Sequence, residues 1–231
     1  MREVNLLKSI PKRSIPKIIR GVSARRANKE ANRRLAFKFD VEYFDGSREQ
    51  GYGGYYYDGR WVAVAKDVIA HFGLKPGDRV LDIGCAKGFL VKDLMDALPG
   101  LEVYGLDVSS YALRHCHPDV AGRLVRGSCD FLPFPDRSFA AALAINTVHN
   151  LDPEGCIRAL KEIERIAPGR GFVQVDAYRT PEELRILEDW MLTAKTYYEP
   201  SGWLDLFAET GYTGDYYWTV LEADPRWTTQ D

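Results

Sequence analysis

The sequence predicts an α/β fold in which helices cover both faces of a doubly wound, mostly parallel sheet. Two observations predict this fold. Short apolar runs alternate with stretches of helical periodicity from about residue 61 to residue 222, as expected for repeated strand–helix units. The first apolar run, residues 80–83, then passes through two glycines into a helical stretch, which is the usual form of a ligand-binding loop in such a sheet.

The expected elements follow one another along the chain. Three of the helices come after a residue that can cap a first turn, namely Ser109 or Ser110, Asp152 and Thr180. The run 139–145 is apolar throughout, so we expect this strand in the centre of the sheet. Helices are expected at residues 61–72, 86–98, 110–115, 152–166, 180–193 and 201–210. Strands are expected at residues 80–83, 101–106, 123–125, 139–145, 172–175 and 216–222.

The length of 231 residues, 45% of them hydrophobic, is enough for one well-buried core with an appendage. No apolar run approaches the roughly 18 residues that cross a bilayer, and the N-terminus lacks a secretory signal, so a soluble protein is expected. Four cysteines stand far apart without a Cys-x-x-Cys pair, which argues against a disulfide framework or a zinc site and favours a cytoplasmic location. They are Cys85, Cys116, Cys129 and Cys156.

Charge is distributed unevenly along the chain. Residues 1–38 hold 12 Lys and Arg against Glu3 and Glu30, a net charge of +10, whereas the remainder carries −12. The simplest interpretation is a solvated arm that packs loosely on the body or on a second subunit, with a helix most expected at residues 24–37. The alternatives are an arm that binds RNA or an anionic membrane surface, and an organellar transit sequence.

Residues 44–61 combine five glycines with a run of aromatic residues. We interpret this segment as a lid whose rings, including that of Tyr55, pack over a cationic or planar ligand, and whose Arg60 pairs with a carboxylate. The alternative is a β-hairpin whose tyrosines cover the core. Residues 1–60 are accordingly expected to form the arm and the lid, and residues 61–231 the α/β domain.

The loop after the first strand favours a ligand without phosphate. A pyrophosphate site needs Gly-x-Gly-x-x-Gly with open backbone amides, whereas this loop reads Asp82-x-Gly84-x-x-x-Gly88. The carboxylate of Asp82 would repel phosphate, but it suits a cationic ligand such as a sulfonium-bearing amino acid. No Gly-x-x-x-x-Gly-Lys-Ser/Thr sequence is present, which argues against hydrolysis of a nucleoside triphosphate.

Two further carboxylates follow the next two strands. Asp107 stands 23 positions after Gly84, at a strand end where a carboxylate can accept both hydroxyls of an adenosine ribose. Asp130 comes after the third strand and can accept from an adenine amino group, while Cys129 offers a backbone amide and an apolar edge. Each acid alone could be a solvated or capping residue, but together they predict an adenosine site.

In these features the chain resembles the class I S-adenosylmethionine-dependent methyltransferases of small-molecule type, which have a Rossmann-like fold. Residues 80–88 resemble the first motif of that family and residues 103–107 its second-strand acid. Residues 127–130 resemble its adenine segment, and residues 132–139 the run into its fourth strand. The resemblance covers roughly residues 60–222 and is more specific as a set than motif by motif.

The resemblance implies S-adenosyl-L-methionine as the cofactor. Gly84 would contact its methionine portion and Asp82 its ammonium group, whereas Ala86 departs from the glycine that is usual in the family. The family's reaction is an in-line displacement at the sulfonium methyl, so the protein mainly aligns the reactants and excludes water. The expected cofactor-binding residues are Tyr55, Arg60, Asp82, Gly84, Cys85, Ala86, Gly88, Phe89, Asp107, Val108, Ser128, Cys129, Asp130 and Asn146.

The methyl acceptor is expected beside residues 145–150, after the fourth strand. His149 is either a general base toward a hydroxyl or ammonium acceptor or a packing residue. Asp176 and Tyr178, at the end of the fifth strand, are further catalytic candidates that we expect to face the acceptor. Nucleic acid is disfavoured as the substrate, because the Asp/Asn-Pro-Pro-aromatic sequence, the cysteine of pyrimidine methylation and a Lys-Asp-Lys-Glu set are absent.

The expected function is therefore methylation of oxygen, nitrogen or carbon in a small molecule, in secondary metabolism or glycan assembly. The alternative is a non-catalytic, methyltransferase-like partner, or an RNA-binding subunit, that acts through the basic arm. Either protein could be a homo-oligomer, and no metal is expected.

Overall fold

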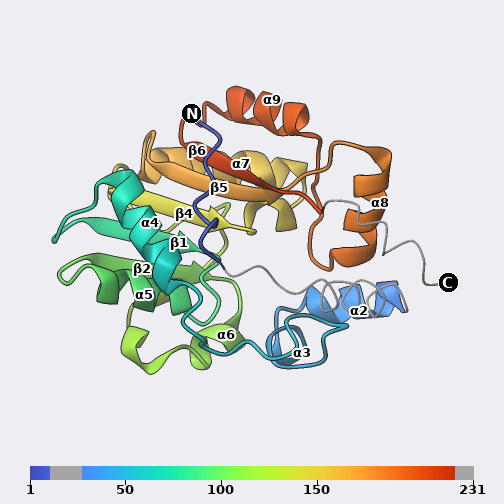
Figure 1. Ribbon diagram of the computed structural model, residues 1–231, viewed down its shortest axis with the longest axis horizontal. Coiled ribbons are helices and arrows are strands. Elements are labelled where there is room, and N and C mark those ends of the chain that lie inside the picture. The colour runs from blue at the N-terminus through green and yellow to red at the C-terminus, as the bar shows by residue number, and fades with distance from the viewer. Residues whose placement is uncertain (11–27, 222–231) are drawn as a thin grey trace.

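The computed structural model describes residues 1–10 and 28–221, and a six-stranded sheet forms its centre (Figure 1). Neighbouring strands pair in parallel in the order β3-β2-β1-β4-β5-β6, which confirms the predicted α/β class. The apolar run predicted for the centre is β4, and it lies between β1 and β5. The strands are β1 (Arg79–Ile83), β2 (Glu102–Asp107), β3 (Leu124–Arg126), β4 (Ala141–Ile145), β5 (Gly171–Asp176) and β6 (Asp215–Thr219).

The helices begin where the sequence offers a cap. The side chains of Ser109, Asp152 and Thr180 each accept the N–H of the third residue of the helix that follows. α5 begins later than predicted because residues 84–88 form a loop, and α2 is the described part of the helix expected at residues 24–37. The helices are α2 (Lys29–Ala36), α3 (Val41–Phe44), α4 (Val62–Phe72), α5 (Phe89–Ala97), α6 (Ser110–Arg114), α7 (Pro153–Ile166), α8 (Pro181–Trp190) and α9 (Pro200–Thr210), with 3₁₀ turns η1 (Pro118–Val120) and η2 (Val148–Asn150).

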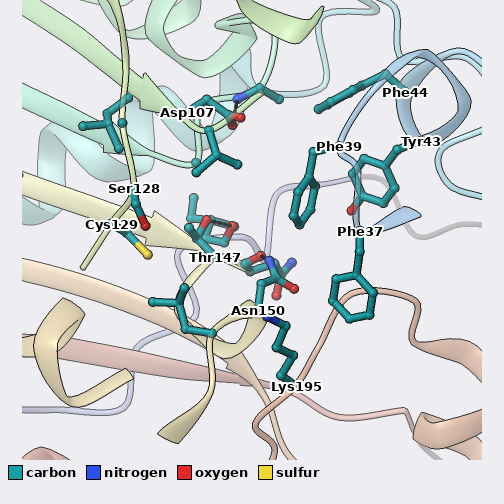
Figure 2. A pocket seen from close by; sticks show the side chains of 18 of the residues that line it. Phe37, Phe39, Tyr43, Phe44, Asp107, Ser128, Cys129, Thr147, Asn150 and Lys195 are labelled. Carbon is teal, nitrogen blue, oxygen red and sulfur yellow. Dashed lines mark hydrogen bonds between the residues drawn. The ribbon is translucent and has the colours of Figure 1, made fainter. Parts of the chain in front are cut away.

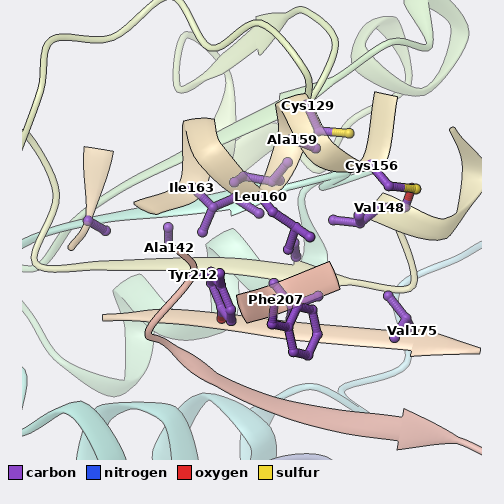
Figure 3. Close-up of a cluster of buried hydrophobic side chains, with 14 of the residues drawn as sticks. Cys129, Ala142, Val148, Cys156, Ala159, Leu160, Ile163, Val175, Phe207 and Tyr212 are labelled. Carbon is purple, nitrogen blue, oxygen red and sulfur yellow. The ribbon is translucent and has the colours of Figure 1, made fainter. Parts of the chain in front are cut away.

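Helices cover both faces of the sheet. On one face, Leu160 of α7 and Phe207 of α9 join Val175 of β5 in a buried apolar cluster (Figure 3). On the other face, Val68 of α4 and Leu94 of α5 belong to a second buried cluster. With both faces covered, a ligand has access to the sheet only at the ends of its strands. Among the described helices, none combines the length and the apolar character needed to cross a bilayer.

The first residues of the chain lie along the outer edge of β6. The N–H of Val4 donates to the carbonyl of Tyr216 (2.8 Å), and the N–H of Tyr216 donates to the carbonyl of Arg2 (3.0 Å). Leu6 is buried in the same cluster as α4. The expectation of a loosely packed arm is therefore wrong for residues 1–10, which satisfy an otherwise open strand edge. The most basic part of the arm, residues 11–27, lies outside the described residues.

The segment between α3 and α4 packs near the strand ends. α2, α3 and α8 lie at the side of the molecule toward which the strand arrows point (Figure 1). Residues 45–61 contain turns and bends but no strand, so the β-hairpin interpretation is wrong. Their rings pack on neighbouring elements instead: Tyr52 contacts Tyr43 (ring centroids 5.2 Å apart), and Tyr55 stacks on Phe89 (4.9 Å).

Candidate active site

Three neighbouring cavities open along the carboxyl ends of the strands. Their volumes are about 430, 240 and 450 Å³ for the first, second and third cavity. Asn146, which directly follows β4, and Tyr52, from the segment before α4, line all three. The three cavities are therefore neighbours on either side of these two residues. Residues that distinguish them are Asp107, Ser128 and Cys129 for the first, His149, Asp176 and Leu192 for the second, and Arg60, Asp82 and Cys85 for the third.

The loop after β1 brings its backbone close to the first cavity. Gly84 has a φ of +80°, and a Cβ at this position would lie 2.1 Å from Thr147 Oγ1, so a side chain does not fit. Ala86 also has a positive φ, +50°, which is uncommon for a residue other than glycine. Its N–H donates to Asp107 Oδ2 (2.8 Å), and this hydrogen bond ties the loop to β2.

Asp107 is fixed in position and still has free acceptor capacity. Its Oδ1 accepts from the N–H of Ser109 (2.8 Å), and its Oδ2 from that of Ala86. Burial raises the pKa of the Asp107 carboxyl, and these N–H groups offset part of that rise. Because each carboxylate oxygen can accept two hydrogen bonds, one site on each remains for a ligand in the first cavity. This arrangement suits a pair of ribose hydroxyls.

Asp82 is buried without a partner. It is 4% exposed, lines the third cavity and accepts no hydrogen bond from any described residue. Burial, together with the smaller effect of the Asp107 charge, raises the pKa of its carboxyl to about 7. A buried carboxylate in this state costs free energy that a neighbouring cation offsets. The position therefore fits the ammonium group of an amino acid.

Aromatic rings close the first cavity on its outer side. Phe39 and Phe44 come from the α2–α3 region and stand across the cavity from Ser128 and Cys129 (Figure 2). Burial raises the pKa of the Cys129 thiol to about 12, so this side chain is a neutral, weakly polar wall. Val108 completes the lining at the end of β2. The space suits a planar, uncharged group such as a nucleobase.

A hydrogen-bonded cluster, which we call the latch, fastens residues 45–61 to the loop that follows β1. Lys87 Nζ donates to both carboxylate oxygens of Asp45 (2.7 and 2.8 Å) and to the carbonyl of Tyr55 (2.8 Å). The Tyr111 hydroxyl also donates to Asp45 (2.7 Å). Burial alone raises the pKa of the Asp45 carboxyl, but the hydrogen bonds from Lys87 and Tyr111 bring it below its ordinary value. The latch, Asp45–Lys87–Tyr111, thus holds the segment over the first and third cavities.

Two predicted lid residues reach the third cavity. The ring of Tyr55 lines it while stacking on Phe89. Arg60 lines it too, but its Nε donates to the carboxylate of Asp58 (2.8 Å). A ligand carboxylate would therefore share this guanidinium with Asp58.

His149 and Asp176 lie side by side at the second cavity, each at most 4% exposed. The N–H of Asp176 donates to His149 Nδ1 (2.8 Å), whereas His149 Nε2 lies 3.8 Å from Asp176 Oδ2. Burial lowers the pKa of the His149 imidazole, an effect that the Asp176 charge opposes. Burial likewise raises the pKa of the Asp176 carboxyl, against the opposing effect of His149.

Four of the predicted site residues line none of the three cavities. Gly88 is the N-cap of α5, and the ring of Phe89 lies beneath Tyr55. The carboxylate of Asp130 accepts a hydrogen bond from Arg158 (2.8 Å). Tyr178 packs in an apolar cluster formed by α8 and the chain that follows it. A role of these four residues in ligand binding stays a prediction.

Several lining residues were missed by the sequence interpretation. The aromatic residues at positions 37, 39 and 43 directly precede the predicted lid, which could have been extended to include them. Lys195 also lines the first cavity, with its Nζ 5.4 Å from the ring centroid of Phe37. It lies between α8 and α9, where no local pattern distinguishes it. The missed residues are Phe37, Phe39, Tyr43, Leu151 and Lys195.

Comparison with known proteins identifies relatives of part of this chain. Residues 80–171 match the family described as "Methyltransferase domain". A sterol 24-C-methyltransferase of Gibberella zeae is 32% identical over 49% of this chain and 31% of its own length. A fatty-acid O-methyltransferase of Mycolicibacterium smegmatis is 35% identical over 49% and 43%. A demethylmenaquinone methyltransferase of Symbiobacterium thermophilum is 30% identical over 52% and 50%. The chain thus spans half or less of the length of these relatives.

Solved structures show the same fold. One is a chain of the complex between the Haloferax volcanii Trm112 methyltransferase activator and a protein described as a methyltransferase, with a TM-score of 0.51 and 24% identity over 64% of this chain and 66% of that one. Another is a Bacillus halodurans protein described as a methyltransferase, with a TM-score of 0.50 and 15% identity over 64% and 68%. At these identities the likeness concerns the fold alone.

Proposed function

We infer that this chain belongs to the class I S-adenosylmethionine-dependent methyltransferases, and that it transfers a methyl group from this cofactor to a small-molecule acceptor. The observation that carries the proposal is that three cavities at the strand ends share Tyr52 and Asn146 in their linings. A sulfonium with adenosyl, methionyl and methyl substituents needs three spaces that diverge from one point. The described strand ends provide such a point.

Each cavity has the chemistry of one substituent. The adenosyl group would occupy the first cavity, with its ribose on Asp107 and its base beside Ser128 and Cys129. The methionyl group would occupy the third cavity, with its ammonium beside Asp82. The second cavity, which contains His149, would then hold the acceptor.

Bound S-adenosylmethionine supplies an electrophilic methyl group. The chain contributes alignment and exclusion of water, since a displacement requires its reactants in line. The latch and the rings of Phe39 and Phe44 cover the first cavity, and rigid strand ends position Asp107. The pKa of the Tyr52 hydroxyl is raised well above its ordinary value by the neighbouring Tyr43 and by burial, so this residue stays protonated at the junction.

A small molecule is supported as the acceptor by the names of the relatives, which specify sterols, a fatty acid and demethylmenaquinone. Those names include transfers to carbon and to oxygen, so they leave the acceptor atom open. The size of the second cavity, about 240 Å³, suits the reacting end of such a molecule. Secondary metabolism or glycan assembly remains our proposed setting.

The cellular setting and the division of the chain are proposals as well. All four cysteines are unpaired, which supports a reducing, cytoplasmic environment. Residues 1–60 would serve as arm and lid for a domain at residues 61–231. The described part of this arm and lid contributes Asp45 of the latch and the aromatic wall of the first cavity, which includes Phe39 and Phe44.

Isothermal titration with S-adenosylhomocysteine tests the proposed cofactor site. We expect one site per chain, and we expect Asp107→Ala to weaken binding by about 1.5 to 3 kcal/mol because hydrogen bonds to a charged acceptor are lost. Asp136→Ala serves as a control, since Asp136 is a largely exposed partner of Arg165 and lines none of the three cavities. No measurable binding by the wild-type chain would contradict the proposal, and equal affinity of the two variants would contradict the role of Asp107.

A further inference from the structure

The second cavity contains one buried carboxylate and one buried imidazole, and their hydrogen bonds distinguish their roles. His149 Nδ1 accepts the backbone N–H of Asp176 at 2.8 Å. A nitrogen that accepts a hydrogen bond carries no proton, so the proton of the neutral ring is on Nε2. The Nδ1 lone pair is occupied and Nε2 has no free pair. The imidazole is thus unable to take a proton from a bound acceptor without breaking this bond.

Asp176 is in the opposite situation. It is 3% exposed, and its carboxylate accepts no hydrogen bond from any described residue. His149 Nε2 lies 3.8 Å from Oδ2, beyond hydrogen-bond distance. A buried carboxylate beside a cavity is costly unless a ligand brings a donor to it. Its lone pairs are available to the second cavity.

We propose that Asp176 is the group that accepts the proton in methyl transfer, and that the acceptor therefore carries an N–H or O–H bond at the reacting atom. His149 is a positioning residue: its Nδ1 accepts the backbone N–H of Asp176. The partial positive charge of its own Nε2–H lies beside Oδ2 of Asp176. This inference rests on the proposed function. The inference narrows the acceptor to amines, alcohols and phenols. It excludes methyl transfer to a carbon atom, because the reacting atom must carry an N–H or O–H bond.

The step conserves atoms and charge. The lone pair of the acceptor's nitrogen or oxygen forms the new bond to the methyl carbon, and the pair of the broken carbon–sulfur bond stays on sulfur. The acceptor's proton moves to the Asp176 carboxylate, which becomes a neutral carboxylic acid and later releases the proton to solvent. Burial raises the pKa of the Asp176 carboxyl toward neutrality, which brings it closer to the value that is best for a general base near pH 7.

No other titratable group at this cavity has the same freedom. The ionisable side chains that line it are those of Tyr43, Arg48, Tyr52, His149 and Asp176. Arg48 donates to the carbonyls of Gly51 and Tyr52 and is a cation, and Tyr52 is held protonated. Trp190, Met191 and Leu192 form an apolar part of the remaining wall, beside Asn146 and Thr193. The described lining of the cavity thus contains one carboxylate that can accept a proton.

Thermal unfolding of the ligand-free chain separates this role from a structural one. If Asp176 is an unpaired carboxylate kept for catalysis, Asp176→Asn and Asp176→Leu should leave the midpoint unchanged or raise it by a few degrees. If the carboxylate stabilises the fold, both substitutions should lower the midpoint, and that result would overturn the proposal. His149→Phe is the comparison, because it removes the ring nitrogen that the Asp176 N–H uses and should lower the midpoint.

Nitrogen NMR of ¹⁵N-histidine-labelled chain, saturated with S-adenosylhomocysteine, tests the imidazole. We expect His149 to show an unprotonated Nδ1 and a protonated Nε2 between pH 6 and pH 8. We expect Asp176→Asn to lower the pKa of His149, since the carboxylate charge raises it in the wild type. An Nδ1–H tautomer, or a His149 ring that takes up a second proton near pH 7, would return the role of base to His149.

Matched probes test the acceptor class. Phenol and anisole differ by the O–H bond, so the wild-type chain with S-adenosylhomocysteine bound should prefer phenol by about 10-fold or more, as expected for a hydrogen bond to a charged acceptor. The preference should disappear in Asp176→Leu while S-adenosylhomocysteine affinity stays the same. No preference in the wild type, or a preference that survives in Asp176→Leu, would overturn the assignment. Loss of S-adenosylhomocysteine binding by the wild type would instead contradict the proposed function.

Discussion

Buried aspartates at the two ends of the sheet differ in how they are satisfied. At the amino end of β6, Asp215 accepts the N–H of Arg2 (2.7 Å) and its guanidinium (3.1 Å), and lies 3.0 Å from His71 Nε2. Burial alone raises the pKa of this carboxyl, but the bonds from Arg2 and His71 bring it below its ordinary value. At the carboxyl end, Asp82 and Asp176 accept no hydrogen bond from a described residue, and the pKa of each carboxyl is raised.

The difference indicates what each aspartate is for. A satisfied carboxylate fixes two parts of the chain together, and Asp215 joins the N-terminal residues to β6 and α4. An unsatisfied buried carboxylate destabilises the ligand-free fold and is retained only where a ligand supplies the missing partner. On this interpretation Asp82 is kept for a cation and Asp176 for a donor on the acceptor.

Substitution of Asp82 and of Asp215 should change the free energy of unfolding in opposite directions. These are the largest effects we expect. Asp82→Asn removes a charge whose burial is uncompensated, so the free energy of unfolding of the ligand-free chain at pH 8 should rise by about 2 kcal/mol. Asp215→Asn removes charge-assisted hydrogen bonds, so in this variant the free energy of unfolding should fall by about 2 kcal/mol. Urea denaturation measures both. A loss of stability in both variants would show that the Asp82 carboxylate stabilises the fold as the Asp215 carboxylate does.

The contributions of Asp82 and Asp215 to the free energy of unfolding should depend on pH in opposite ways. The folded pKa of Asp82 is about 7 and its unfolded value about 3.9, so between these values the folded state binds more protons and stability falls as pH rises. The stabilisation by Asp82→Asn should therefore be larger at pH 8 than at pH 5 by about 2 kcal/mol. The folded pKa of Asp215 is lowered, so its contribution is present above about pH 4 and is lost as pH falls through the folded value. A pH-independent effect of Asp82→Asn would show that its carboxyl titrates normally.

Opening the latch should have a smaller effect, confined to the carboxyl end. Lys87→Met breaks the contact with Asp45, and we expect S-adenosylhomocysteine to dissociate about 10-fold faster in stopped-flow fluorescence, as for the loss of one charged hydrogen bond. The matched control is Lys161→Met, because Lys161 is exposed on α7 and lines none of the three cavities. Equal dissociation rates in the two variants would show that the latch does not retain the ligand.

Ala86→Gly should have the smallest effect. Glycine relieves the positive φ at this position, which favours the folded state by about 1 kcal/mol, but it removes a methyl group that packs near Phe44. We expect a change in the free energy of unfolding within about 1 kcal/mol and little change in affinity for S-adenosylhomocysteine. A large loss of affinity would mean that the alanine side chain itself contacts the ligand.

Most of the fold could be predicted because its signals are local. The caps Ser109, Asp152 and Thr180 and the apolar run of β4 act within a few residues of the chain. The N-terminal edge was missed because it depends on pairing between residues more than 200 positions apart, such as Val4 and Tyr216. Periodicity within one segment contains no information on such pairing.

The site was predictable where the backbone itself positions a residue. Asp82, Gly84 and Asp107 stand at strand ends that the topology brings together, and the structure places them at adjoining cavities. Asp130 is predicted to lie at the adenine, and its carboxylate accepts a hydrogen bond from Arg158 on α7, a contact that the strand pattern does not reveal. The aromatic wall comes from the α2–α3 region, whose packing across the strand ends is equally non-local.

The most direct test of the difference between the two ends is the proton balance of ligand binding. Burial raises the pKa of the Asp82 carboxyl to about 7, so part of the ligand-free chain is protonated there near pH 7, and an ammonium group should drive its ionisation. Titrations with S-adenosylhomocysteine at pH 7, in buffers of different ionisation enthalpy, should show that the wild type releases more protons on binding than Asp82→Asn does. Identical proton balance in the wild type and in Asp82→Asn at pH 7 would contradict the assignment of Asp82 as the residue that receives the ligand's cation.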